Sequence, residues 1–275
     1  MFMETDRAKV YYEEYGEGIP LVFLHGYHID HKCLSVPIEE RAGGLEGFRR
    51  IYPDLPGMGL TELKEPVSTT EELFAIILPF IDRITDGKPF AVAGYSYGGY
   101  LARGVVKVRT KKVLGMLLVC PVIFPERTSR IVPDFVVQEQ DVEFIQKLSP
   151  EDREFFTESC VIQTETVYNK FRKEIAEPFA LADRKMLKNL QRQAYSFEKP
   201  VDKTNMDFDG PSLFLAGRQD SVVGYEDIYS IFNNYSGAEL TILNRAGHNL
   251  QIEREAEFLR LVEAWSQRVL LLKKE

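Results

Sequence analysis

The chain has 275 residues, 44% of them hydrophobic, and a net charge of −8. That apolar share suffices for a large core, and the acidic balance argues against nucleic acid or an anionic membrane as a partner. Three widely spaced cysteines predict reduced thiols, and the acidic N-terminus and short apolar runs predict neither a secretion signal nor a membrane span. We therefore expect a cytoplasmic protein.

The first part of the chain alternates between predicted strands and helices. Strands are expected over 1–4, 9–15, 20–24, 48–52, 89–95 and 112–120, with helices over 68–85 and 97–108. The two earliest strands are short and alternate in polarity, which favours antiparallel pairing. The later order of strand, helix and strand is typical of a parallel α/β sheet.

The pattern changes after residue 122. Helical spacing is found over 136–148, 150–159, 164–175 and 183–195, with prolines between these stretches and no convincing strand. Strands are again expected over 211–216 and 238–243, followed by a long helix over 253–272. We predict a discontinuous core of 1–122 and 206–275, interrupted by an all-helical cap over 123–205.

The stretch Gly94-Tyr95-Ser96-Tyr97-Gly98 lies where a predicted strand meets a predicted helix. This G-x-S-x-G pattern is typical of a nucleophile elbow, a sharp turn that exposes a serine hydroxyl. The two glycines relieve the crowding of such a turn because they lack a Cβ atom. The pattern thus predicts Ser96 as an exposed nucleophile above a helix N-terminus.

Two later loops supply the other groups that a serine nucleophile needs. Asp220 follows the strand over 211–216, and His248 follows the strand over 238–243. Serine needs a base to remove its proton, and the histidine needs a carboxylate to fix its tautomer. Because the carboxyl ends of parallel strands share one sheet edge, we expect Ser96, Asp220 and His248 to converge there.

The chain resembles the α/β-hydrolase superfamily, and in particular its esterase-like members with a helical cap. The matching stretches are Leu24-His25-Gly26-Tyr27, Asp54-Leu55-Pro56-Gly57-Met58-Gly59, Gly94-Tyr95-Ser96-Tyr97-Gly98-Gly99, Gly217-Arg218-Gln219-Asp220 and Ala246-Gly247-His248. The resemblance implies a mostly parallel eight-stranded sheet flanked by helices. Epoxide hydrolases and haloalkane dehalogenases of this fold would carry aspartate at position 96, so serine there argues against both.

The resemblance also implies roles for individual residues. Ser96 would be the nucleophile, His248 the general base and acid, and Asp220 the orienting carboxylate. The backbone N–H groups of Tyr27 and Tyr97 would form the oxyanion hole. No cofactor is implied, and no spacing of His, Cys, Asp and Glu predicts a metal site.

The substrate pocket is less defined by the sequence. Its candidates are His28, Tyr95 and Phe124, although Tyr95 could equally pack into the sheet and His28 or His31 could be solvated loop residues. His25 and Asp54 are interpreted as structural through the resemblance. Arg127 and Arg130 could meet a carboxylate, but solvation or pairing with cap acids is favoured.

The leading hypothesis is a serine hydrolase that cleaves a small carboxylic ester, lactone or related acyl compound through an acyl-enzyme. It would act on a small-molecule substrate as a monomer or homodimer. One alternative is a ligand sensor of the same fold with slow hydrolysis. Another is a carbon–carbon bond hydrolase that acts on a diketone with the same nucleophile.

Overall fold

The computed structural model describes residues 1–202 and 208–272. Its central sheet has the strand order β1-β2-β4-β3-β6-β7-β10-β11, with β5 paired to β2. The strands are β1 (Phe2–Glu4), β2 (Ala8–Tyr15), β3 (Ile19–Leu24), β4 (Phe48–Pro53), β5 (Glu62–Leu63), β6 (Phe90–Tyr95), β7 (Val113–Val119), β10 (Ser212–Gly217) and β11 (Ala238–Leu243). This order is typical of an α/β sheet, in which helices connect strands that follow one another in the sequence.

The sheet is mostly parallel, as predicted. Across the sheet, the neighbouring strands β4, β3, β6, β7, β10 and β11 all pair in parallel. Strand β2 pairs antiparallel with β1, β4 and β5. The expected eight strands are joined by a ninth, β5, whose two residues are too few to leave a sequence pattern. Strands β3 and β6 are buried at every residue, since parallel strands covered on both faces are apolar throughout.

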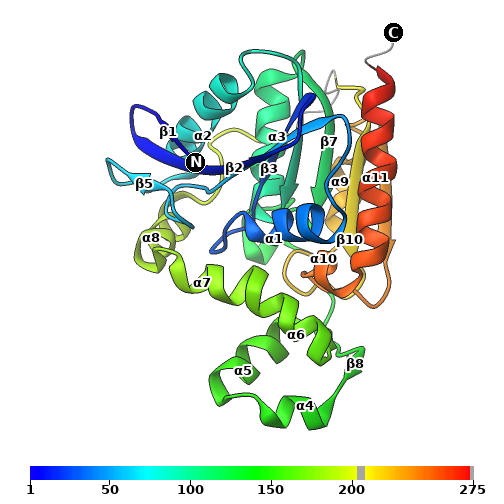
Figure 1. Ribbon diagram of the computed structural model, residues 1–275. Coiled ribbons are helices and arrows are strands. Elements are labelled where there is room, and N and C mark those ends of the chain that lie inside the picture. Colours follow the sequence, from blue (N-terminus) through cyan, green and yellow to red (C-terminus); the bar gives the residue numbers. More distant parts are fainter. Residues whose placement is uncertain (203–207, 273–275) are drawn as a thin grey trace.

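Helices cover both faces of the sheet (Figure 1). Those of the core are α1 (Lys32–Ser35) with the π-helix η1 (Val36–Arg41), α2 (Thr70–Ile84), α3 (Tyr97–Arg109), the 3₁₀ turn η4 (Glu226–Ile228), α9 (Tyr229–Phe232), α10 (Leu250–Glu253) and α11 (Glu255–Leu271). Thr69 caps α2 by accepting the Glu72 N–H, as serine or threonine is expected to do there. On α11, Trp265 is buried and donates its indole N–H to the Pro211 carbonyl at 2.9 Å.

The chain between β7 and β10 forms a cap segment beyond the carboxyl ends of the strands (Figure 1). It contains η2 (Arg127–Ser129), β8 (Glu139–Gln140), α4 (Val142–Lys147), α5 (Pro150–Ser159), β9 (Ile162–Gln163), α6 (Glu165–Phe171), the π-helix η3 (Arg172–Ala176), α7 (Glu177–Leu181) and α8 (Arg184–Ala194). The predicted domain boundary between 205 and 206 lies outside the described residues.

The prediction of an all-helical cap is wrong at one place. Strands β8 and β9 pair in parallel through two residues each, which is too short for a period to show in the sequence. The helix expected from residue 136 begins only at Val142, because Asp141 accepts the Phe144 N–H and caps it there. Within the described chain, no helix is both long and apolar enough to cross a membrane.

Candidate active site

Ser96 lies at the sharp turn between β6 and α3. Its backbone has φ 54° and ψ −116°, a region that non-glycine residues rarely adopt. The turn is tight enough that a Cβ on Gly98 would lie 2.0 Å from the Leu24 carbonyl oxygen, and one on Gly94 would lie 2.3 Å from the Gly98 oxygen. Both glycines are therefore required for the strand and helix to meet at this angle.

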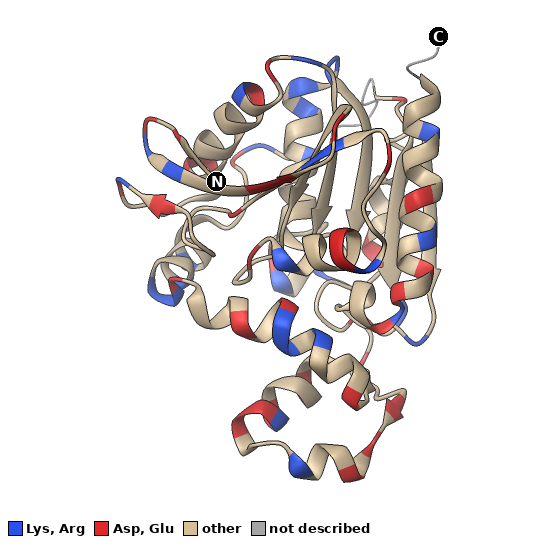
Figure 2. Ribbon diagram, viewed as in Figure 1, with Lys and Arg blue, Asp and Glu red and all other residues tan. Residues whose placement is uncertain are grey.

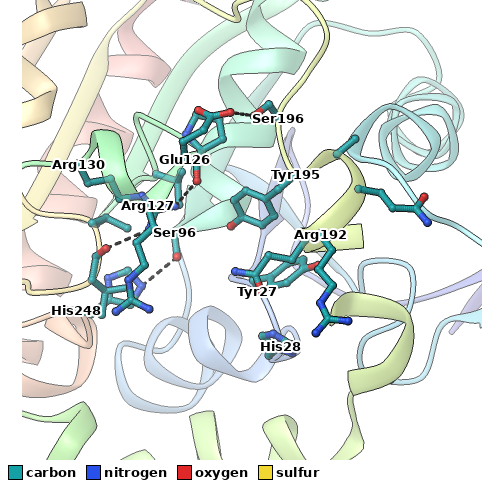
Figure 3. A pocket seen from close by; sticks show the side chains of 17 residues that line it. Tyr27, His28, Ser96, Glu126, Arg127, Arg130, Arg192, Tyr195, Ser196 and His248 are labelled. Carbon is teal, nitrogen blue, oxygen red and sulfur yellow. Dashed lines mark hydrogen bonds between the residues drawn. The ribbon is translucent and has the colours of Figure 1, made fainter. Parts of the chain in front are cut away.

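Ser96, His248 and Asp220 come together in one hydrogen-bonded chain, and Figure 3 shows its Ser96–His248 part. The Ser96 Oγ atom is 3.0 Å from His248 Nε2, and His248 Nδ1 is 2.9 Å from Asp220 Oδ2. An ionised Asp220 keeps the proton on Nδ1, which leaves Nε2 as the acceptor for the serine proton. The arrangement joins a hydroxyl, an imidazole and a carboxylate by two consecutive hydrogen bonds.

Asp220 is fully buried, yet its surroundings favour the charged form. Burial alone would raise the pKa of this carboxyl, but His248 and the N–H groups of Val222 and Val223 lower the pKa below its ordinary value. The two N–H groups lie 2.9 and 3.0 Å from Oδ1. They hold the carboxylate in place while its other oxygen faces the imidazole.

The N–H groups of Tyr27 and Tyr97 have no hydrogen-bond acceptor among residues 1–202 and 208–272. The Tyr97 N–H opens α3, where the first N–H groups of a helix lack an internal partner. The side chains of both residues are fixed elsewhere. The Tyr27 hydroxyl donates to the Leu187 carbonyl at 2.6 Å, and the Tyr97 hydroxyl lies 2.8 Å from Thr70 Oγ1.

A cavity of about 560 Å³ opens in front of Ser96 (Figure 3). Its wall includes Tyr27 and His28 from the core and Tyr195 from the end of the cap segment. His28 thus lies in the cavity, as one of the two sequence alternatives had it. Burial, with Arg184 nearby, lowers the pKa of its imidazole below the ordinary value, which favours the neutral ring.

Two predicted pocket residues do not line this cavity. Tyr95 is buried behind His248, and its hydroxyl lies 3.2 Å from both the His248 carbonyl and Asn249 Oδ1. The Tyr95 hydroxyl is thus held by the loop that carries His248 and does not reach the cavity. Phe124 lines an adjoining groove with Tyr100 and Phe197 instead.

The other histidines are structural, and the interpretation of His31 as a solvated loop residue is wrong. Its Nδ1 lies 2.7 Å from Asp54 Oδ1 in a buried pair. Burial would lower the pKa of His31, but Asp54 outweighs this effect and raises it. His25 accepts the Leu55 N–H at 2.8 Å, and burial lowers its pKa to about 4, so it stays neutral.

Among residues 1–202 and 208–272, two clusters have ligand atoms close enough together to surround a metal ion, although the sequence spacing does not reveal either. One joins Cys120 to Asp220 and His248, and the other joins Asp30, His31 and Asp54. In the first, the aspartate and histidine are already bonded to each other. In the second, Asp54 accepts N–H groups of His31 and Leu60, and Asp30 accepts that of Lys32. We assign no metal to either cluster.

The chain belongs to the alpha/beta hydrolase family, whose sequence profile matches residues 21–261. It is 25% identical to a pimeloyl-[acyl-carrier protein] methyl ester esterase from Legionella pneumophila over 87% of this chain and 91% of that protein. A crystal structure of an alpha/beta superfamily hydrolase from Oenococcus oeni superposes with a TM-score of 0.85 at 27% identity, covering 94% of this chain and 96% of that one. A thermophilic esterase from Thermogutta terrifontis shares the fold, with a TM-score of 0.64 at 20% identity over 95% and 94% of the two chains. The protein is thus a hydrolase of the α/β fold.

Proposed function

We propose that the protein is a serine hydrolase that cleaves a small carboxylic ester, lactone or related acyl compound. The observation that carries this proposal is the hydrogen-bonded chain from Ser96 through His248 to Asp220 at the cavity wall. The similarity to a methyl ester esterase supports an ester as the bond that is broken.

In the proposed reaction, Ser96 Oγ attacks the carbonyl carbon while His248 Nε2 takes its proton. The resulting oxyanion accepts the N–H groups of Tyr27 and Tyr97, and the charge of Asp220 stabilises the imidazolium. His248 then gives the proton to the departing alcohol oxygen, and the acyl group stays on Ser96. A water molecule, deprotonated by the same nitrogen, releases the acid and restores the serine.

A fluorophosphonate probe tests the nucleophile. We expect the probe to label the wild type. It should also label the control variant Ser129→Ala, because Ser129 is an exposed serine that does not line the cavity. Ser96→Ala should not be labelled. Equal labelling of the wild type and Ser96→Ala, or labelling of neither, would contradict the proposal.

A substrate panel separates the proposal from the two alternatives. It should contain chromogenic esters of increasing acyl length, lactones and a β-diketone, with Ser96→Ala as the blank. Turnover of esters or lactones supports the proposal. Labelling of Ser96 without turnover of any compound would favour a ligand sensor, and turnover of the diketone alone would favour carbon–carbon bond hydrolysis.

A further inference from the structure

Three arginine side chains line the cavity in front of Ser96, namely Arg127, Arg130 and Arg192. Among the described residues that line it, Glu126 is the one carboxylate. This excess of positive charge contrasts with the net charge of −8 of the whole chain. In Figure 3 the Arg127 side chain lies beside Ser96 and His248, and Arg192 lies across the cavity beside Tyr27.

Arg130 is held by backbone carbonyl groups and not by a carboxylate. It donates to the oxygens of Phe124 and Pro125 at 2.8 Å each and to that of Val222 at 3.1 Å. These three bonds hold the guanidinium in place through Nε, Nη1 and Nη2, but a neutral carbonyl does not cancel the charge. Arg130 therefore leaves a fixed positive charge at the cavity wall.

Arg127 and Arg192 differ from the arginines that are paired elsewhere on the surface. Within the described chain, neither side chain forms an ion pair or a hydrogen bond, whereas Arg49 and Arg109 each bind a carboxylate. A guanidinium presents parallel N–H donors whose spacing matches two oxygens of a carboxylate or phosphate. Both groups are thus available to an anion that enters the cavity.

Of the nearby acidic groups, Asp227 interacts with the charge of Arg130, and none forms a salt bridge with Arg127 or Arg192 in the described structure. The Glu126 carboxylate accepts a hydrogen bond from the Ser196 hydroxyl and is not in salt-bridge contact with any of the three arginines in the described structure. Every charged residue within α8, which carries Arg192, is basic (Figure 2). The cavity wall on this side therefore remains positive.

We propose that Arg127 and Arg192 form an anion subsite, and that the substrate carries a carboxylate or phosphate group in addition to its ester or lactone bond. This inference rests on the proposed function, since it assigns the class of substrate to the same site. The anionic group forms charge-assisted hydrogen bonds with the two guanidiniums and is attracted by Arg130. A neutral ester of the same length forms no charge-assisted hydrogen bond and is not attracted by Arg130. The subsite therefore makes the enzyme prefer anionic over neutral esters.

Matched esters test the subsite. On the acyl side, the charged esters are monomethyl glutarate and the phosphate monoester of methyl hydroxybutanoate, and their neutral partner is methyl hexanoate. On the alcohol side, the charged ester is butyryl glycolate, and its neutral partner is propyl butyrate. We expect kcat/KM to favour at least one charged ester over its neutral partner by about tenfold, and this preference to shrink as added salt screens the exposed arginines.

The variants are Arg127→Gln, Arg192→Gln and the double change, with Arg260→Gln as the control that removes an exposed α11 arginine outside this cavity. We expect the double change to reduce the charged-to-neutral ratio by about tenfold and the control to leave that ratio unchanged. Comparing carboxylate with phosphate identifies which anion the subsite takes.

Equal or greater preference for the neutral esters in the wild type, or a ratio that the double change does not alter, would overturn the subsite and leave the serine hydrolase intact. If no ester is turned over, the proposed function fails, and the subsite is decided by calorimetry on Ser96→Ala. There, monomethyl glutarate should bind about tenfold more tightly than methyl hexanoate. Equal binding of the two would overturn the subsite independently of turnover.

Discussion

The Glu253 carboxylate accepts the backbone N–H of Gly247, the residue before His248, at 2.6 Å. Its second oxygen accepts the N–H of Val161 at 2.6 Å and that of Ile162 at 3.3 Å, both from the cap segment. One buried side chain therefore joins the histidine loop to the cap. Burial raises the pKa of Glu253 from 4.5 to about 7, although the three N–H groups favour the charged form.

Replacing Glu253 by glutamine should change how stability depends on pH. Between about pH 4.5 and 7, the folded protein keeps a proton on Glu253 that the unfolded chain releases. The contribution of Glu253 to the free energy of unfolding is thus fully present below about pH 4.5 and is lost as the pH rises through about 7. Since each pKa unit is worth about 1.4 kcal/mol, the difference in unfolding free energy between the wild type and Glu253→Gln should change by roughly 3 kcal/mol over this range.

Urea denaturation at several pH values measures this difference. Glu263→Gln is the matched control, because Glu263 is exposed on α11 and forms no salt bridge within the described chain. The control should follow the wild type at every pH. Parallel pH curves for Glu253→Gln and the wild type would show that Glu253 is not the titrating group.

Asp220→Asn should reduce kcat far more than it reduces stability. Asparagine can still accept the N–H groups of Val222 and Val223, but its amide does not stabilise an imidazolium. We expect kcat to fall by roughly 10³- to 10⁴-fold, as is found when the aspartate of such a triad is changed in this way. Steady-state kinetics with an accepted ester measures the loss.

Asp227→Asn is the control for this change. Asp227 is also buried, but its carboxylate accepts the Ile131 N–H away from His248. It should retain most of the activity. If the two variants lose activity equally, Asp220 is no more important than any other buried carboxylate.

The sheet and the convergence of Ser96, Asp220 and His248 were predictable because each signal is local. A buried strand is a continuous apolar run, and the loop after it falls at a known edge. The cavity wall has no such signal. Tyr195 reaches it because Thr70 Oγ1 donates to its carbonyl at 2.8 Å, a contact between residues 125 positions apart.

The same reason explains why the sequence left the position of Tyr95 open and why His31 was not recognised as buried. Whether Tyr95 faces the cavity or packs behind His248 depends on how the loop after β11 folds, which no pattern around Tyr95 encodes. Likewise, the buried position of His31 follows from its contact with Asp54, 23 residues away. Short strands such as β8 and β9 depend entirely on the packing of the segments that bring them together.

Tyr95→Phe should lower kcat and leave KM unchanged. The Tyr95 hydroxyl reaches the His248 carbonyl and Asn249 Oδ1, and its one proton can serve only one of them at a time. Removing the hydroxyl takes away a hydrogen bond that holds the backbone of His248, but it changes no side chain that lines the cavity. The loss of one hydrogen bond is worth about 1 kcal/mol, so we expect kcat to fall about fivefold.

Tyr235→Phe provides the comparison, since this buried tyrosine donates to Asp202 at 2.7 Å and lies outside the cavity wall. It should cost stability without changing kcat. A raised KM in Tyr95→Phe with unchanged kcat would instead mean that Tyr95 contacts the substrate.

Gly98→Ala should disrupt the elbow, whereas Gly104→Ala in the same helix should be tolerated. The added methyl at position 98 would lie 2.0 Å from the Leu24 carbonyl oxygen, and all the nearest atoms are backbone of Leu24 and His25, which cannot move aside as a flexible side chain can. At position 104 the nearest atom is on the Phe197 ring at 3.1 Å, which can shift, and alanine favours the helix. We expect Gly98→Ala to lose about 3 kcal/mol of unfolding free energy and its activity, and Gly104→Ala to stay near the wild type. Urea unfolding and ester hydrolysis measure both, and a Gly98→Ala protein as stable and active as Gly104→Ala would mean that α3 can move away from the end of β3 without harm to Ser96.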